Sequence, residues 1–339
     1  MELAGTILHG PELEPIRGRV IVEEGDIERV ERDDSVSEQA LILPAFVNAH
    51  THIGDSIAKE AGRGLDLEEL VAPPDGLKHR LLEEADRSSL VTAMRRSLKY
   101  MQAGGTGACL DFREGGEVGV RMLQEAAMGL DIEAMALGRE STAAMEAGDG
   151  FGASGANDGS FDVERAATRE AGKPFGIHAG EADASDVNEA LDLDPDFIVH
   201  GVHLEEIHLE RIEDREVPVV LCPRSNVTTG VGLPPVEQLA ERTTLALGTD
   251  NVMLNGPSMF REMAFLSAMS DLEAPEILRM ATVNGAGLAG LDWGVIEAGR
   301  RARLTVLDGD SHNLTGAVDP VRAVVRRACV ADVERLVVP

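Results

Sequence analysis

The middle of this 339-residue chain alternates short apolar runs with longer stretches of helical pattern, and that alternation limits the folds open to it. Repeated βα units are typical of α/β proteins with a parallel sheet. If eight such strands are present, they form a (β/α)₈ TIM barrel. The alternative is an open doubly wound sheet, but no GxGxxG motif follows an early strand. The runs that read as buried strands are Leu41–Val47, Gly107–Phe112, Ile132–Leu137, Phe175–His178, Phe197–His200, Val217–Cys222 and Thr244–Gly248.

The eighth strand is expected within residues 53–78, where the pattern is weakest. Residues 148–159 are rich in glycine and are expected to form a loop. Helices are expected at Leu81–Ala103, Val163–Ala171, Leu209–Glu213 and Pro257–Met269. Both chain ends instead resemble each other in short strands separated by turns. These are Thr6–Leu8, Arg19–Glu23, Ile27–Glu31, Leu304–Leu307, Val321–Val325 and Val333–Val338.

The charge balance is strongly acidic, with 60 Asp and Glu against 31 Lys and Arg and a net charge of −29. The acids are spread along the chain, so a disordered acidic tail does not explain them. Concentrated salt screens such self-repulsion, because the Debye length falls to about 3 Å at 1 M. We therefore expect a salt-adapted protein from the cytoplasm of a halophile. Nucleic acid is an unsuitable partner, since phosphate binding requires a basic face.

The three cysteines are Cys109, Cys222 and Cys329, and they form no CxxC pair. This argues against a disulfide framework and against a thiolate zinc site. The first residues lack the pattern of a signal peptide, and no apolar run reaches membrane-spanning length. We therefore expect a cytoplasmic protein without a membrane partner, acting on a small molecule, with homo-oligomers left open.

Histidines and acids follow four of the expected strands. His50 and His52 end the first run, and their two-residue spacing places both rings on one face of an extended chain. His178 ends another run, with Glu181 three residues on. His200 and Asp250 each follow a later run. His203 comes three positions after His200, and because three is an odd number the two side chains cannot share a face of an extended chain. Imidazoles with a carboxylate suit Zn²⁺ or Fe²⁺ in hydrolytic sites.

Each of these residues also has a simpler reading. His50 and His52 could be unrelated loop histidines, Glu181 could be solvated, and Asp250 could cap the next helix. Taken together and in this order, the motifs resemble those of the amidohydrolase superfamily over nearly the whole chain. The resemblance rests on Pro44–His52, His178–Glu181, His200, Leu221–Asn226, Thr249–Asp250, Ala281–Ala286 and the segment 297–308.

That resemblance implies a metal-bearing (β/α)₈ catalytic barrel over residues 45–296. It also implies a small composite β-sandwich domain from residues 1–44 and 297–339. Binuclear relatives carry a carboxylated lysine on the fourth strand, but no lysine lies between Lys99 and Lys173. The His-x-x-Glu motif instead resembles the mononuclear aminohydrolase branch, which includes deaminases and chlorohydrolases. Glu140 stays open as a bridging carboxylate for a second metal.

By the same resemblance, one divalent ion is held by His50, His52, His178 and Asp250, with Zn²⁺ favoured over Fe²⁺. Asp250 would accept a proton from the attacking water, Glu181 would protonate a ring nitrogen, and His200 would orient the water or the developing charge. Expected substrate-binding residues are Arg113, Arg224, Asn226 and Asn255, with Arg139 also plausible. The implied activity is hydrolytic deamination of a purine, pyrimidine or related ring. The alternatives are hydrolysis of a cyclic amide, displacement of a non-amine leaving group, and a non-catalytic binding relative.

Overall fold

A computed structural model describes residues 1–71 and 76–339. The chain divides into two compact units. The larger comprises residues 49–99 and 109–257, and the smaller comprises residues 1–48, 100–108 and 258–339. Both terminal segments therefore belong to the same unit. The predicted domain boundaries at residues 44 and 297 stay a prediction.

The larger of the two sheets has nine strands, in the order β12-β11-β10-β9-β8-β7-β6-β5-β13. The pairs from β7/β8 to β11/β12 are parallel, and so is β13/β5. Because β13 follows β12 closely in the chain and pairs with β5, the sheet curls back on its first strand. This arrangement fits the predicted (β/α)₈ barrel. The strands are β5 Phe46–His52, β6 Thr106–Arg113, β7 Glu133–Gly138, β8 Gly150–Gly155, β9 Phe175–Ala179, β10 Phe197–His200, β11 Val219–Leu221, β12 Leu245–Leu247 and β13 Asp250–Asn251.

Strand β8 corrects two expectations at once. It lies in the glycine-rich stretch that was predicted to be a loop, whereas the described part of residues 53–78 forms helical turns. Its glycines make room for a neighbouring ring: a Cβ added at Gly152 would lie 2.5 Å from the Phe112 ring. Phe112 is fully buried on β6. Glycine therefore serves packing here, against its low intrinsic preference for strands.

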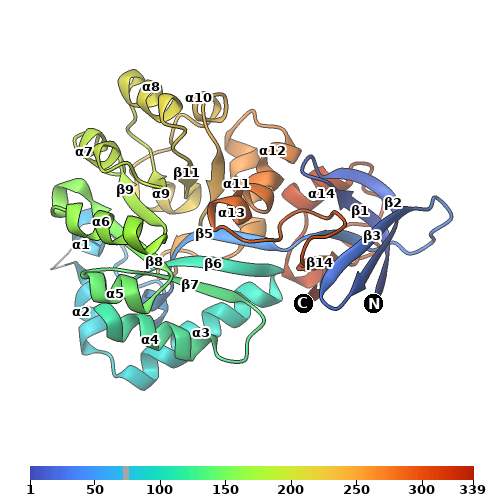
Figure 1. The fold of residues 1–339 in the computed structure, drawn as a ribbon, viewed down its shortest axis with the longest axis horizontal. Coiled ribbons are helices and arrows are strands. Elements are labelled where there is room, and N and C mark those ends of the chain that lie inside the picture. Colours follow the sequence, from blue (N-terminus) through green and yellow to red (C-terminus); the bar gives the residue numbers. More distant parts are fainter. Residues whose placement is uncertain (72–75) are drawn as a thin grey trace. The chain divides into compact units, whose positions relative to one another are not determined.

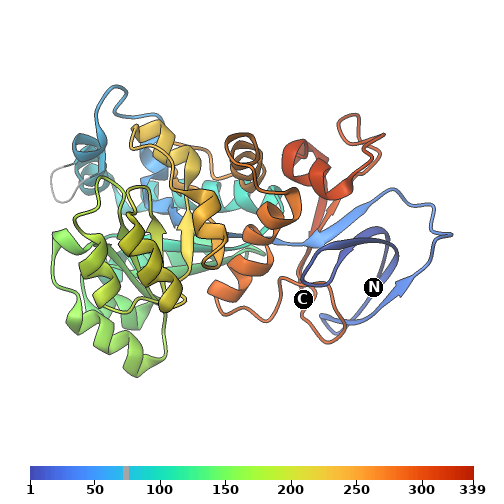
Figure 2. The ribbon, with the colours of Figure 1, turned by 90° about the horizontal axis from the view of Figure 1, so that it is seen from above.

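Helices lie around the outside of these strands (Figures 1 and 2). The predicted helix over residues 81–103 is two helices, α2 and α3, and Asp86 between them accepts a hydrogen bond from the backbone N–H of Ser89. The helices of the larger unit are α1 Leu67–Val71, α2 Leu77–Glu84, α3 Arg87–Ala103 (continuing into the smaller unit), α4 Gly116–Ala127, α5 Thr142–Ala147, α6 Asp162–Ala171, α7 Val187–Asp192, α8 Glu206–Asp214, α9 Pro223–Thr229 and α10 Val236–Ala240. Short 3₁₀ turns are η1 Ile53–Ala58 and η2 Ala156–Asp158.

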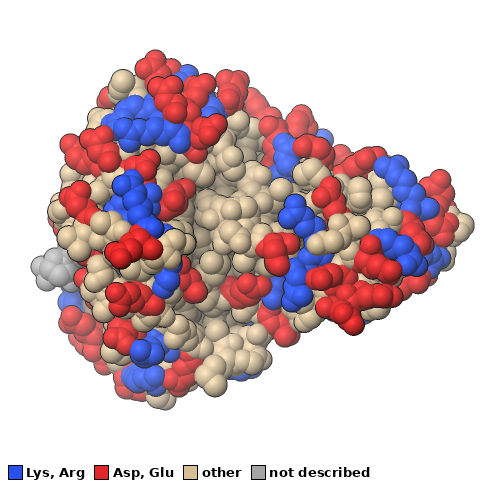
Figure 3. Space-filling model, in the orientation of Figure 1, with Lys and Arg blue, Asp and Glu red and all other residues tan. Residues whose placement is uncertain are grey.

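Acidic side chains occur around most of the periphery of the face shown in Figure 3, interleaved with Lys and Arg, whereas its centre carries mainly other residues. This matches the even spread of acids along the sequence. Within residues 1–71 and 76–339, the structure contains no helix both long enough and apolar enough to cross a membrane.

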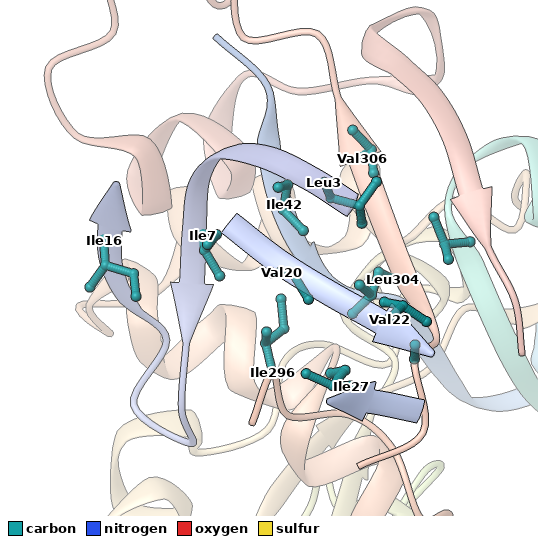
Figure 4. Close-up of a cluster of buried hydrophobic side chains, with 12 residues drawn as sticks. Leu3, Ile7, Ile16, Val20, Val22, Ile27, Ile42, Ile296, Leu304 and Val306 are labelled. Carbon is teal, nitrogen blue, oxygen red and sulfur yellow. The ribbon is translucent and has the colours of Figure 1, made fainter. Parts of the chain in front are cut away.

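The smaller unit contains a six-stranded sheet built from both ends of the chain, in the order β15-β14-β4-β1-β2-β3. A two-sheet sandwich is therefore not confirmed. Apolar side chains from these strands, among them Ile7, Val20, Ile42 and Leu304, form a buried cluster (Figure 4). The strands are β1 Glu2–His9, β2 Glu14–Glu23, β3 Asp26–Arg32, β4 Leu41–Pro44, β14 Leu304–Leu307 and β15 Val333–Val337.

The segment Val321–Val325 is helical, which corrects the predicted strand. Asp319 accepts a hydrogen bond from the backbone N–H of Arg322, and Pro320 occupies the first turn. An Asp cap followed by proline is a strong helix start, and it outweighs the strand preference of the valines. The remaining helices are α11 Met259–Met269, α12 Ala274–Met280, α13 Val283–Leu288 and α14 Pro320–Arg326, with η3 at Val330–Asp332.

Candidate metal centre and active-site cavity

The ends of β5 and β13 bring three polar side chains together. His50 and His52 lie on β5, and Asp250 pairs with it from β13. The Nε2 atoms of His50 and His52 lie 3.2 and 3.6 Å from Asp250 Oδ1. This close approach requires Gly248, where an added Cβ would lie 2.7 Å from the Cβ of His50. The expectation that both rings of the HisXHis pair share a face therefore matches their positions in the structure.

The neighbouring strands β9 and β10 supply His178 and His200. The His178 Nε2 lies 3.3 Å from the His52 Nε2. His200 and Asp250 both have positive φ angles, 76° and 57°, although neither is glycine. Such conformations cost about 1–3 kcal/mol each, and they concentrate at functional sites. The chain thus tolerates backbone strain at two of the predicted site residues.

Hydrogen bonds fix which ring nitrogens face the centre. His52 Nδ1 donates to Glu114 Oε1 at 2.7 Å, and His178 Nδ1 donates to the carbonyl oxygen of Ala153 at 2.8 Å. In a neutral imidazole, the other nitrogen then carries a lone pair. The two Nε2 lone pairs therefore face each other across 3.3 Å with no proton between them. Such an arrangement is repulsive unless a cation lies between the two nitrogens.

The residues fit a metal ion on a second observation. His50 is fully buried, and neither of its ring nitrogens has a hydrogen-bond partner within the part of the chain that the structure describes. Three sets could share an ion: His50 with His178 and His200, His50 with His52 and Asp250, and Glu181 with His200 and Asp250. Imidazole nitrogens combined with one carboxylate are typical zinc ligands. The predicted ligands His50, His52, His178 and Asp250 are thus brought together, and His200 joins them.

The charges in the centre suit ligands that bind a cation. Burial lowers the pKa of His52 to about 3, with the nearby Lys78 ammonium adding to the effect. Burial also lowers the pKa of His178 well below its usual value. For Asp250, burial alone would raise the pKa, but the close contact with His50 and the electrostatic attraction of the neighbouring histidines outweigh it and lower the pKa well below normal. The centre therefore offers neutral imidazoles and an ionised carboxylate.

Glu181 lies beside the centre, and its pKa moves in the opposite direction to that of Asp250. Its Oε2 is 3.5 Å from the Nε2 of His200, and its side chain is 21% exposed. Burial raises the pKa of the Glu181 carboxyl. His200 is oriented in turn by Asn226, whose Oδ1 lies 2.8 Å from His200 Nδ1. A carboxyl group with a raised pKa beside an ionised Asp250 is suited to act as an acid.

These groups open on a cavity of about 540 Å³ within the larger unit. Its lining includes His52, His178, Glu181, His200 and Asp250, and loops after several strands complete it. A cavity of this size suits a small heterocycle or a nucleoside-sized molecule.

The four predicted substrate-binding residues lie elsewhere, and their role stays a prediction. None of them is among the described residues that line the cavity. Arg113 is buried against Asp111 and Glu114 and borders a separate cavity of about 250 Å³. Arg224 donates to the carbonyl oxygen of Gly256, Asn255 contacts Thr228, and Asn226 holds His200. Arg139, the further candidate, does line the cavity.

Sequence reasoning missed a buried charge network behind His52. Glu114 Oε1 lies 2.6 Å from Lys78 Nζ and 3.3 Å from an Arg139 nitrogen, while Glu114 Oε2 accepts from Arg113 at 2.7 Å. Glu114 directly follows β6, a strand-end position that could have drawn attention to it. Lys78 does not follow a predicted strand, so no sequence pattern indicated it. Glu140, the candidate bridging carboxylate, accepts a hydrogen bond from Gly115 N and borders the smaller cavity.

Comparison with known proteins shows the family. Residues 41–338 match the model of the amidohydrolase family, and the chain belongs to that family of hydrolases. A provisionally named aminohydrolase of Methanothermobacter thermautotrophicus is 35% identical, covering 95% of this chain and 93% of that protein. One of Archaeoglobus fulgidus, also provisionally named, is 37% identical, covering 95% and 92%. A 5-methylthioadenosine/S-adenosylhomocysteine deaminase of Natronomonas pharaonis is 31% identical, covering 50% of this chain and 45% of that protein.

Solved structures show the same fold at low identity. Zinc-complexed atrazine chlorohydrolase of Arthrobacter aurescens aligns with a TM-score of 0.83 at 18% identity, covering 99% of this chain and 93% of that one. Guanine deaminase of C. acetobutylicum, with guanine bound, aligns with a TM-score of 0.78 at 15% identity, covering 99% and 98%.

Proposed function

We propose that this protein is a mononuclear, metal-dependent aminohydrolase that deaminates a small heterocycle. The observation that carries the proposal is the 3.3 Å distance between the Nε2 atoms of His52 and His178, whose Nδ1 atoms are hydrogen-bonded elsewhere. His50 and Asp250 complete this group, and Glu181 borders it. Relatives named as deaminases support the choice of reaction. Zinc is the favoured ion, because the donor set suits it and because a solved structure of the same fold is described as a complex with zinc.

The roles of the chain's own groups follow from their protonation states. A divalent ion held by His50, His52, His178 and Asp250 would supply an acidified water at neutral pH. Asp250, ionised in the resting site, accepts a proton from the attacking water. Glu181 donates a proton to a ring nitrogen of the substrate, which makes the adjacent carbon electrophilic. His200 is held by Asn226, and its Nε2 lies beside Glu181. From this position it stabilises the charge that develops at the attacked carbon.

Ammonia release separates this proposal from its alternatives. We expect the zinc-loaded protein to release ammonia from at least one member of a panel of amino-substituted purines, pyrimidines, nucleosides and triazines. Ring opening of a cyclic amide, or chloride release from a chlorotriazine without ammonia, would instead favour the other hydrolytic reactions. Binding without any turnover would favour a non-catalytic relative.

The raised pKa of Glu181 predicts the alkaline side of the pH profile. Because the group acts as an acid, its protonated form is the active one, and burial keeps that form present at higher pH than in an ordinary carboxyl group. We expect kcat/KM to fall about tenfold per pH unit once the pH passes the pKa of Glu181. Steady-state kinetics across the pH range measure this. A profile that keeps rising on the alkaline side would contradict the assignment.

The net charge of −29 carries a separate proposal, that the protein works in the salt-rich cytoplasm of a halophile. Screening of its self-repulsion should then raise the melting temperature from dilute buffer to molar salt. An unchanged melting temperature would contradict salt adaptation.

A further inference from the structure

Lys78 is a buried lysine at the wall of the cavity. Its side chain is 3% exposed, and it lies on α2, within the larger unit. Burying an ammonium group is costly unless it is paired, and lysine is rare in this chain. Surface charge alone therefore does not explain why a lysine occupies this position.

Pairing with Glu114 explains only part of the arrangement. Glu114 also accepts from Arg113 at 2.7 Å and contacts Arg139 at 3.3 Å, so this carboxylate has cationic partners without Lys78. Lys78 Nζ has three N–H groups. Glu114 Oε1 accepts one at 2.6 Å and Asn251 Oδ1 accepts a second at 3.0 Å. Within the described residues no further partner contacts Lys78 Nζ, and Lys78 is one of the residues that line the cavity.

Arg139 places a second cation at the same point. Its guanidinium contacts the same oxygen, Glu114 Oε1, so the two cationic groups are close neighbours. Arg139 also lines the cavity, and most of its five donors are not used by that contact. The same oxygen accepts from His52 Nδ1 at 2.7 Å, which ties both cations to the edge of the metal centre.

Most of the other charged side chains in the described lining are acidic. Histidines aside, Lys78 and Arg139 are the cationic side chains among the described lining residues, whereas carboxylates border the cavity at Asp66, Glu68, Asp158, Asp183 and Asp186. Apart from the proposed metal ion, Lys78 and Arg139 are therefore the groups of the described lining that would attract a negatively charged substituent. A highly charged group such as a triphosphate would meet repulsion from the acidic lining.

We propose that Lys78, together with Arg139, forms an anion subsite that selects heterocyclic substrates carrying a single carboxylate-sized anionic group and sets their orientation. This inference names the substrate class for the proposed deaminase site and rests on that proposal. Lys78 supplies one charge-assisted hydrogen bond from its third N–H, and Arg139 supplies a planar donor pair.

The test compares matched ligands by calorimetry on the full-length, zinc-loaded protein. The pairs are uracil with uracil-6-carboxylate and purine with purine-6-carboxylate. We expect each acid to bind at least about tenfold more tightly than its parent base to the wild type, as a charge-assisted hydrogen bond implies. In Lys78→Met, this preference should fall to about onefold while affinity for the parent bases and zinc content are kept. Lys78→Arg should retain part of the preference, and Lys99→Met, at an exposed lysine on α3, should retain all of it.

Two outcomes would overturn the inference. One is equal affinity of the wild type for acid and parent base, and the other is a preference that survives in Lys78→Met. If Lys78→Met loses zinc or unfolds, the comparison of Lys78→Arg with the wild type replaces it. An unchanged preference for the acids in Lys78→Arg, together with no preference in Arg139→Met, would assign the subsite to Arg139 alone. If ammonia is released only from uncharged rings, and at the same rate in Lys78→Arg as in the wild type, deamination is supported and the anion subsite is contradicted. No ammonia release at all would remove deamination while the binding comparison stands.

Discussion

Replacing Glu181 by Gln is expected to lower kcat about 10²–10⁴-fold while leaving the metal content unchanged. Glutamine has nearly the same shape and keeps the position beside His200, but it has no carboxyl proton to give to the substrate ring. Glu181 also lies outside the predicted ligand set of three histidines and Asp250. Steady-state turnover and elemental analysis on the same preparation measure the two quantities.

Glu170→Gln is the matched control, since Glu170 is an exposed carboxylate on α6. It should leave turnover within about twofold, as expected for a surface substitution. Near-normal turnover in Glu181→Gln would remove Glu181 from the mechanism. Loss of zinc together with turnover would instead make Glu181 a ligand, contrary to the assignment.

Replacing Glu114 by Ala is expected to destabilise the protein by about 3–5 kcal/mol. The substitution leaves the buried ammonium of Lys78 without a carboxylate partner, and it leaves the guanidinium of Arg113 with Asp111 alone. It also removes the acceptor that orients His52, and loss of such a partner lowers metal affinity about 10–100-fold. Urea unfolding of the metal-free and zinc-loaded forms separates the two effects.

Glu117→Ala is the control for that experiment. Glu117 forms an exposed ion pair with Arg121 one helical turn away, a contact that contributes less than about 1 kcal/mol. If Glu114→Ala costs no more than Glu117→Ala, the buried network does not stabilise the fold. If zinc affinity is unchanged, Glu114 does not orient His52.

The sequence predicted much of the barrel because buried parallel strands are short apolar runs that end in polar residues. Such a run ends at His178 and another at His200, and the chain places both side chains at one centre. Strand β8 was missed because Gly152 is selected by the Phe112 ring that packs on it, a contact between strands far apart in sequence. Local propensity does not contain that information.

The charge network behind the centre was missed for a similar reason. Lys78 lies on a short helix with no apolar strand before it, and only the folded chain brings it to Glu114 and Asn251. Arg113 was expected in the substrate cavity because it ends a strand, but its side chain turns to Asp111 and Glu114. Strand ends therefore indicate where polar residues gather, and the direction of each side chain depends on its partners.

The central claim is that one metal ion held by His50, His52, His178 and Asp250 is required for hydrolysis. Its most direct test removes the metal with a chelator and restores it in steps, with zinc content and ammonia release measured on each sample. We expect turnover to be lost in the metal-free protein and to return in proportion to zinc, reaching its maximum near one ion per chain. Full turnover in the metal-free protein would contradict it.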